Sequence, residues 1–273
     1  MNQYSLAVII PNYNKGVYIS RCVESVINQT RIPDEIVVVD DCSTDDSVDI
    51  ICKLQDIYSR IRLVQLNSNK GVSAARNLGA NSTNCNYITF LDSDDVYYNS
   101  KKLENEMSLI EEYAERGIDI VAYSPIVVID EFDKVIRTPP RNPFWFNTGD
   151  CYFRFLSNYK SETLPRDFCM RKNMFYEVGG YSFYKNFYED LDLVIRLSHE
   201  YYFYCTYEYG TGYRQLPGGL SKRPKVDHKD TLKEIRNHYL SDEVFLVKIA
   251  SILVGGLWRF VSKTLRIINR YTH

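Results

Sequence analysis

The spacing of apolar residues changes repeatedly along the first 130 positions of this 273-residue chain. Short, continuously apolar runs, as expected for strands covered on both faces, alternate with segments whose apolar residues recur at helical spacing. The runs predict strands at residues 6–11, 35–40, 61–66 and 87–91. Helical spacing is clearest at Ile19, Cys22, Val23, Val26 and Ile27. This alternation predicts an α/β fold with a mostly parallel central sheet flanked by helices.

The pattern changes after about residue 130. Residues 137–150 are rich in proline and aromatic side chains and predict a loop. Beyond it, we expect a strand, a short helix and a Gly-Gly turn within residues 168–182, an amphipathic helix within residues 188–201, and aromatic β structure within residues 202–216.

The C-terminal tail, residues 221–273, differs in charge from the domain before it. From residue 244 onward it contains no acidic residue and five basic ones, Lys248, Arg259, Lys263, Arg266 and Arg270. Lysine and glycines interrupt its apolar stretch, so it falls short of the roughly 20 apolar residues that a membrane-spanning helix needs. Two interpretations stay open: a basic amphipathic helix lying in a membrane interface, or a helix packed on the domain.

Polar side chains follow three of the predicted strands, at residues 12–14, 40–43 and 92–95. In open parallel sheets, ligands bind beyond the carboxyl ends of the strands. We therefore expect these three clusters to line one binding crevice.

Composition narrows the possible partners and compartments. A net charge of −2, with no nucleic-acid-binding motif, argues against a nucleic-acid partner. The N-terminus lacks a basic segment followed by a long apolar stretch, so we expect no signal peptide. The seven cysteines are odd in number and never spaced as CxxC, which favours reduced thiols in the cytoplasm.

Asp92, Asp94 and Asp95 place three carboxylates within four positions after a predicted strand. Like charges this close repel one another unless a cation neutralises them. Oxygen-only ligands suit a hard divalent ion, Mg²⁺ or Mn²⁺, which shares its coordination with substrate phosphates. The alternative is a solvated acidic turn that caps the next helix.

Two further positions at this predicted rim carry chemistry. Asp40 could accept hydrogen bonds from a base N–H or a ribose hydroxyl, while Ser43 or Thr44 is expected to cap the following helix. Arg76, on a helix opened by Gly71, could clamp a diphosphate or pair with a crevice carboxylate. The chain has no Walker A or GxGxxG motif, which disfavours kinase, ATPase and dinucleotide-binding functions.

Four motifs, "VIIPNYNKGVYISRCVESVINQT", "EIVVVDDCSTDDS", "NKGVSAARNLGA" and "YITFLDSDD", together resemble the nucleotide-sugar half of family 2 glycosyltransferases. The resemblance covers about residues 5–100 and implies a GT-A fold. It divides a domain of residues 1–220 into a Rossmann-like nucleotide-sugar half, residues 1–130, and an acceptor half, residues 131–220. Any one of these motifs is a weak signal, whereas four in this order are specific.

The resemblance implies an inverting, metal-dependent transferase of hexosyltransferase type. Its expected donor is a UDP-sugar, its cofactor Mn²⁺ or Mg²⁺, and its acceptor a saccharide or lipid-linked saccharide, as in bacterial surface polysaccharide synthesis. We expect a cytoplasmic protein, with peripheral contact at the inner membrane face through the tail. Donor-side roles fall on Pro11, Asn12 and Tyr13 at the base, Asp40 at uracil, Arg76 at the diphosphate, Asp92 and Ser93 at the donor, and Asp94 at the metal.

Later landmarks of the family resemble "EVGGYS" and "YEDLDLVIRL" in this chain. They imply that Asp190 is the general base and that Glu189 belongs to the acceptor site. Inversion needs a base opposite the leaving diphosphate, which agrees with carboxylates in both halves. Acids at a helix N-terminus also arise from the helix dipole alone.

One stretch departs from the family pattern. "YRQLPGGLS" places Leu216 where the family often carries a histidine near the metal, so a protein ligand from this loop is not expected. Arg214 and Ser221 are candidate contacts on the diphosphate side.

A non-catalytic nucleotide-sugar-binding protein is the alternative function. Such a protein would be expected to have lost the base or the metal carboxylates, and this chain retains both. A sugar nucleotidyltransferase would need a Gly/Arg-rich N-terminal loop, which "IIPNYNKG" lacks.

Overall fold

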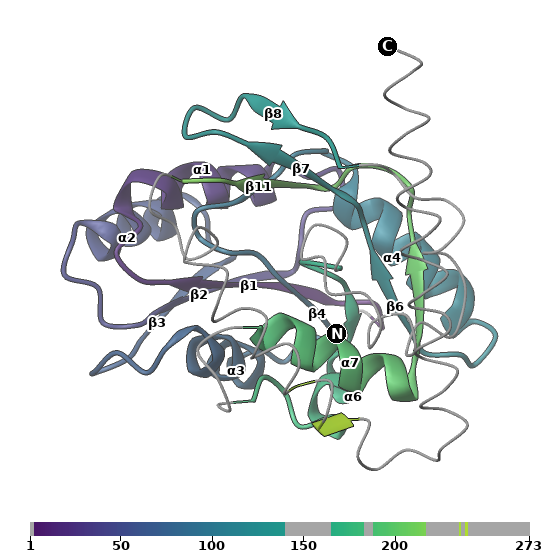
Figure 1. Ribbon diagram of the computed structural model, residues 1–273. Coiled ribbons are helices and arrows are strands. Elements are labelled where there is room, and N and C mark those ends of the chain that lie inside the picture. Colours follow the sequence, from purple (N-terminus) through teal and green to yellow (C-terminus); the bar gives the residue numbers. More distant parts are fainter. Residues whose placement is uncertain (1–2, 140–164, 183–187, 217–234, 236–237, 240–273) are drawn as a thin grey trace.

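The four apolar runs form neighbouring strands of one sheet. In the computed structural model they are β1 (Leu6–Asn12), β2 (Glu35–Asp40), β3 (Ile61–Gln65) and β4 (Tyr87–Phe90), each within one residue of its predicted bounds. They pair in parallel in the order β3-β2-β1-β4, and β9 (Met170–Arg171) pairs antiparallel with β4 at the edge (Figure 1). The predicted mostly parallel sheet is confirmed.

The structure describes residues 3–139, 165–182, 188–216, 235 and 238–239. The predicted loop from residue 140 onward, almost all of the predicted tail, and Ser221 therefore lie outside the described residues. Within the described residues, no helix is both long enough and apolar enough to cross a bilayer.

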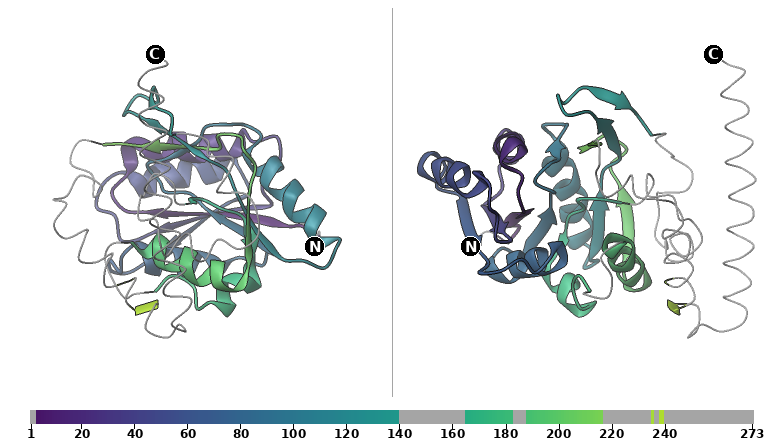
Figure 2. Two further views of the ribbon diagram at one scale, coloured as in Figure 1. Left: turned by 45° about the vertical axis from the view of Figure 1, so that its right-hand side comes forward. Right: turned by 60° about the vertical axis from the view of Figure 1, so that its left-hand side comes forward.

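Helices lie on both faces of the sheet (Figures 1 and 2). One buried cluster contains side chains of α1 (Gly16–Ile27), α2 (Ser47–Ile57) and α4 (Lys102–Ala114), and another those of α3 (Val72–Ser82), α6 (Lys172–Glu177) and α7 (Glu189–Glu200). Alternate residues of β1 divide between them, Val8 and Ile10 in the first and Ala7 and Ile9 in the second. Burial on both faces explains why β1 is apolar from Leu6 to Pro11.

The rest of the chain adds two smaller sheets. β5 (Val96–Tyr97), β11 (Thr211–Arg214), β7 (Ile126–Ile129) and β8 (Val135–Arg137) form a sheet in the order β5-β11-β7-β8, and β10 (Tyr202–Cys205) pairs in parallel with β6 (Ile120–Tyr123). The helix and β structure predicted within residues 188–216 are confirmed. Strands β5 to β8 were not among the predicted elements. Since β4 ends just before residues 92–95 and β5 begins just after them, this acidic turn connects two sheets.

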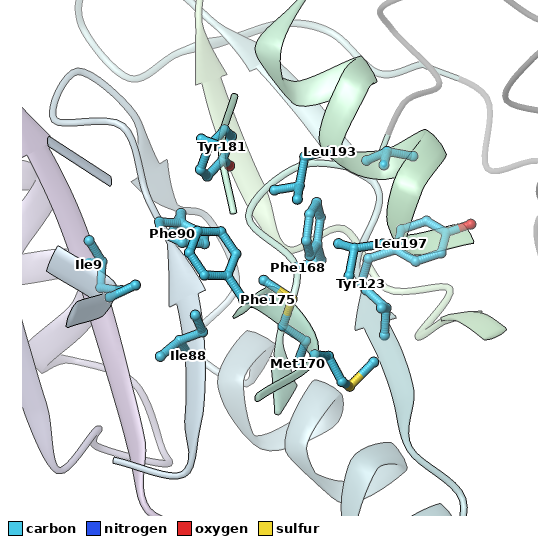
Figure 3. Close-up of a cluster of buried hydrophobic side chains, with 14 of the residues drawn as sticks. Ile9, Ile88, Phe90, Tyr123, Phe168, Met170, Phe175, Tyr181, Leu193 and Leu197 are labelled. Carbon is cyan, nitrogen blue, oxygen red and sulfur yellow. The ribbon is translucent and has the colours of Figure 1, made fainter. Parts of the chain in front are cut away.

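One aromatic cluster connects β4 to the second half of the chain (Figure 3). The ring of Phe90 lies 5.5 Å from that of Phe175 in α6 and 5.2 Å from that of Tyr181, between ring centroids. Leu193 and Leu197 of α7 belong to the same cluster. This packing holds the first turn of α7 close to the carboxyl end of β4.

The start of α2 differs from the prediction. α2 begins at Ser47, and no side chain caps it at the preceding residue. Ser43 donates hydrogen bonds to Asp40 instead, because Cys42 adopts a left-handed conformation (φ 64°) that turns the chain back toward the sheet. The expected cap at Ser43 or Thr44 is therefore wrong. Asp41 accepts hydrogen bonds from the backbone N–H groups of residues 70 and 71, at the start of α3.

Gly79 allows α3 to approach the sheet closely. A Cβ atom there would lie 2.3 Å from Ile9 Cγ2 and 3.1 Å from Val39 Cγ2. We expect Gly79→Ala to lower the free energy of unfolding by about 1–3 kcal/mol, the usual cost of overpacking a core. Urea denaturation measures this change. The exposed Asn81→Ala on the same helix is the control, expected within about 0.5 kcal/mol of wild type; equal effects of the two variants would contradict the packing argument.

Candidate active site

Asp40 lies buried where β1 and β2 end side by side, in register with Asn12. Its Oδ1 accepts hydrogen bonds from Asn12 Nδ2 at 2.8 Å and Ser43 Oγ at 2.6 Å, and its Oδ2 accepts one from the Ser43 N–H at 2.9 Å. Pro11 is buried beside them, and Tyr13 is 45% exposed. The fold therefore brings the predicted base-contact residues together at one end of the sheet.

Asp92 is held between two arginines. Its Oδ1 lies 2.6 Å from Arg76 Nη2, and its Oδ2 lies 2.9 Å from Arg166 Nη2. Burial alone would raise the pKa of Asp92, but these two guanidinium groups outweigh that effect and lower it below its usual value. The two arginines therefore favour the ionised form of Asp92, whose side chain is 23% exposed. Ser93, next to it, is buried.

Asp94 and Asp95 have contrasting surroundings. The Asp94 side chain is 24% exposed, and its Oδ2 lies 2.6 Å from Lys15 Nζ. Asp95 is buried, and its Oδ1 accepts a hydrogen bond of 2.7 Å from the Arg214 backbone N–H. Burial and the nearby Asp94 charge raise the pKa of Asp95 well above its usual value, which favours its protonated form. Asp94 is thus the more accessible of these two carboxylates, while Asp95 is buried and bonded to the backbone of Arg214 in β11.

Arg76 joins the acidic turn to the start of α7. Its Nη2 contacts Asp92, and its Nη1 lies 3.2 Å from both Glu189 Oε1 and Asp190 Oδ1. The guanidinium is 4% exposed and lies over the Tyr181 ring, 4.8 Å from its centroid. Carboxylates separated by about a hundred residues in the sequence therefore meet around one buried cation.

Glu189 and Asp190 differ in accessibility at this meeting point. Their side chains are 17% and 29% exposed, respectively. Burial, together with the neighbouring Asp190 charge, raises the pKa of Glu189 above its usual value. The more exposed Asp190 is the better placed of the two to reach an incoming molecule.

Sequence reasoning missed two cations at this site, Lys15 and Arg166. Lys15 directly follows the "PNYN" strand end, so its position in the sequence could have placed it at the crevice. Arg166 had none, because it lies some seventy residues after Asp92 in sequence; its guanidinium also lies over the Tyr213 ring, 4.4 Å from the centroid. The next residue, Asp167, is buried, and burial raises its pKa to about 7.

The end of β11 and the residues after it contribute less to the site than the sequence suggested. Arg214 is buried, and each of its side-chain nitrogens donates to a protein oxygen. Leu216 is half-buried where the family often has histidine. Across the described residues, no group of three or more His, Cys, Asp or Glu side chains is arranged to hold a metal.

Comparison with known proteins identifies the family. The profile described as "Glycosyl transferase family 2" matches residues 7–191, which include the acidic turn, Arg76 and the Glu189–Asp190 pair. The chain belongs to glycosyl transferase family 2. The predicted resemblance is thereby confirmed at the level of the family.

Several proteins similar to this chain are bacterial glycosyltransferases. A putative teichuronic acid biosynthesis glycosyltransferase of Bacillus subtilis, TuaG, is 39% identical over 107 residues, covering 39% of this chain and 42% of that protein. An uncharacterized glycosyltransferase of Haemophilus influenzae is 29% identical over 254 residues, covering 86% of this chain and 77% of that protein. The match with TuaG thus spans less than half of that relative.

Solved structures agree with a GT-A fold. Residues 1–349 of TarS from S. aureus, crystallised with UDP-GlcNAc, superpose with a TM-score of 0.68 at 21% identity, covering 88% of this chain and 68% of that chain. The same protein with UDP gives a TM-score of 0.62 at 22% identity, covering 87% and 72%. At this identity the likeness concerns the fold, and the expected GT-A architecture is confirmed.

Proposed function

We propose that this family 2 protein transfers a sugar, with inversion, from a UDP-sugar to a hydroxyl of a saccharide or lipid-linked saccharide. One observation carries the proposal: Arg76 joins Asp92, at the end of the nucleotide-binding strands, to Glu189 and Asp190 at the start of α7. A donor-side carboxylate and a candidate base therefore share one site. Inverting transfer needs such an arrangement, because the base must act on the side of the sugar opposite the leaving group.

Asp190 is the proposed general base. Arg76 contacts its Oδ1, the described residues place no hydrogen-bond donor on its Oδ2, and the side chain is partly exposed. In the proposed step, a carboxylate oxygen takes the proton of the acceptor hydroxyl while that oxygen bonds to the anomeric carbon and the bond to the diphosphate breaks. Arg76 orients this carboxylate.

The donor is proposed to bind along the ends of β1, β2 and β4. The nucleobase would lie at Pro11, Asn12, Tyr13 and Asp40, where Asp40 Oδ2 accepts only the Ser43 backbone N–H from the described residues. The ribose would lie near Asp92 and Ser93. Lys15 adds a partly exposed positive charge beside Asp94, where a diphosphate would be attracted.

The residues of the acidic turn fit a divalent cation that binds together with the donor. Asp92 and Asp94 are similarly exposed, at 23% and 24%, but both oxygens of Asp92 pair with arginines and Asp95 is buried. Asp94 pairs through Oδ2 with Lys15, so among the described residues it is the carboxylate of this turn best able to bind a cation. One carboxylate combined with phosphate oxygens and water is a usual environment for Mg²⁺, and Mn²⁺ prefers similar ligands. When bound, such an ion stabilises the negative charge that develops on the leaving diphosphate.

The cellular setting is proposed from the relatives. TuaG is named for teichuronic acid biosynthesis, and TarS was crystallised with UDP-GlcNAc, which supports a bacterial surface polymer and a UDP-sugar. We further propose the two halves, residues 1–130 and 131–220, a cytoplasmic location, and peripheral membrane contact through residues 221–273. A purely binding function is less well supported, because both acidic groups are retained at one site.

A thermal-shift panel tests the donor class. We expect UDP and UDP-sugars with Mn²⁺, at one hundred times their dissociation constants, to stabilise the protein by about 2.7 kcal/mol relative to the unliganded protein. ADP, GDP and CDP at the same concentration should stabilise it less. Equal stabilisation by all four nucleotides would contradict the assignment of Asp40 to uracil.

Asp94→Ala tests the metal assignment. We expect this variant to lose the part of UDP binding that depends on Mn²⁺, because the accessible carboxylate of the turn is gone. Calorimetric titration of UDP with and without Mn²⁺ measures the loss. Asp56→Ala, an exposed acid on α2, is the control and should bind as wild type does. An unchanged metal response in Asp94→Ala would refute the ligand assignment.

A further inference from the structure

Arg214 was expected on the diphosphate side, but its contacts lie within the protein. Its side chain is fully buried. The Nε atom donates to the Asp94 carbonyl oxygen at 2.5 Å, Nη1 donates to the Asp130 carbonyl oxygen at 2.7 Å, and Nη2 donates to the Asp133 carboxylate. The guanidinium also lies over the Tyr18 ring, 5.0 Å from its centroid. A guanidinium engaged in this way holds protein groups in place.

The backbone of Arg214 holds the same acidic turn. Its N–H donates to Asp95 Oδ1 at 2.7 Å, while β11 pairs with β5, the strand that directly follows the turn. On its other side β11 pairs in parallel with β7 (Figure 1). Arg214 thus contacts the turn on both sides of the Asp94–Asp95 peptide, through the Asp94 carbonyl and the Asp95 side chain.

Asp133, in the turn between β7 and β8, is shared by two arginines. Its Oδ1 accepts from Arg214, and its Oδ2 lies 2.8 Å from Arg21 Nη1 on α1. Arg21 Nη1 also donates to the Glu131 carbonyl oxygen at 3.3 Å. The Asp133 side chain is 36% exposed, so this end of the connection lies near the protein surface.

We infer that Arg214 and Asp133 are positioning residues for donor binding. Asp133 fixes the direction of the Arg214 guanidinium, and Arg214 in turn fixes the backbone that presents Asp94 to the crevice. The inference rests on the proposed function in one respect, that Asp94 serves the donor and its cation. It adds that the β7–β8 turn, through Asp133 and Arg214, controls how well that site is formed.

Asp133→Asn tests the inference with little risk to folding. Asparagine tolerates the left-handed conformation of this residue (φ 69°) but offers one acceptor oxygen where two arginines need two. We expect hydrogen exchange of the backbone amides in residues 92–97 to become about tenfold faster, as local opening becomes easier. UDP affinity with Mn²⁺ should fall about tenfold, the effect of one lost charge-assisted hydrogen bond. The midpoint of global unfolding should change little.

Glu131→Gln is the matched control. It removes one carboxylate charge from the same turn, and the contact seen for Glu131 uses its carbonyl oxygen, so exchange and affinity should match wild type. Unchanged exchange of residues 92–97 in Asp133→Asn would overturn the inference. If the exchange changes but wild-type protein binds no UDP with Mn²⁺, the positioning connection stands and the proposed donor function fails.

Discussion

Asp190→Asn is expected to reduce sugar transfer by about 10²–10⁴-fold, the usual contribution of a general base. Asparagine keeps the size of the side chain and a contact with Arg76, but it cannot take the proton of the acceptor hydroxyl. Binding of UDP should stay close to that of wild type, because the donor groups lie at the ends of β1, β2 and β4. Release of UDP measures transfer, and calorimetry measures binding.

Two comparisons sharpen this test. Glu189→Gln should have a smaller effect on transfer than Asp190→Asn, because Glu189 is the less exposed of the two acids. Glu200→Gln, an exposed acid at the other end of α7, should transfer as wild type does. Wild-type turnover in Asp190→Asn would remove Asp190 from the mechanism, and equal losses in all three variants would point to a general disturbance of α7.

Arg76→Met should have the largest effect on stability. The substitution leaves Asp92, Glu189 and Asp190 facing one another without their shared cation. Removing one partner of a buried ionic network typically costs about 3–5 kcal/mol. Urea denaturation at pH 7 measures the loss. Arg116→Met is the matched control: Arg116 and Glu112 are both more than half exposed, and surface pairs contribute about 0–1 kcal/mol.

The same variant should show a characteristic pH dependence. In wild type, Arg76 and Arg166 outweigh burial and lower the pKa of Asp92, so its stabilising effect is present at neutral pH and is lost as the solution becomes acidic. Without Arg76, burial and neighbouring acids should raise the pKa values of Asp92 and Glu189. The variant should therefore lose stability as the pH rises and these groups ionise. The stability difference should therefore shrink between pH 7 and pH 5. A constant difference across this range would mean that Arg76 acts through packing alone.

Much of the donor half could be predicted because its signals are local. A strand buried on both faces is apolar along most of its length, and this locates β1, β2 and β4 to within a residue. The carboxyl ends of parallel strands meet at one edge of a sheet, so Asn12, Asp40 and Asp92 could be placed at one crevice from their positions alone.

Arg76 was predicted to clamp a diphosphate or to pair with a crevice carboxylate, and it pairs with Asp92. Other groups that contact the acidic residues could not be predicted in the same way. Arg166 contacts Asp92, and Arg214 contacts Asp94 and Asp133. These pairs are 74 to 120 residues apart in the sequence, and the local spacing of apolar and polar residues carries no information about contacts over such separations. Ser43 looked like a helix cap because the local pattern fits one, yet the left-handed Cys42 directs it to Asp40. Arg214 was a candidate contact on the diphosphate side, whereas its position in β11 directs it into the protein. In each case tertiary contacts decided the role of a side chain whose local pattern fitted another.

The most direct test of the central claim is proton NMR of a UDP-sugar with an α-linked sugar, incubated with the protein, Mn²⁺ and a saccharide acceptor. If Asp190 and the donor site act on opposite sides of one sugar, the newly formed product should carry the β configuration, and Asp190→Asn should suppress its formation. A product that first appears with the α configuration, or that forms equally fast in Asp190→Asn, would contradict the account.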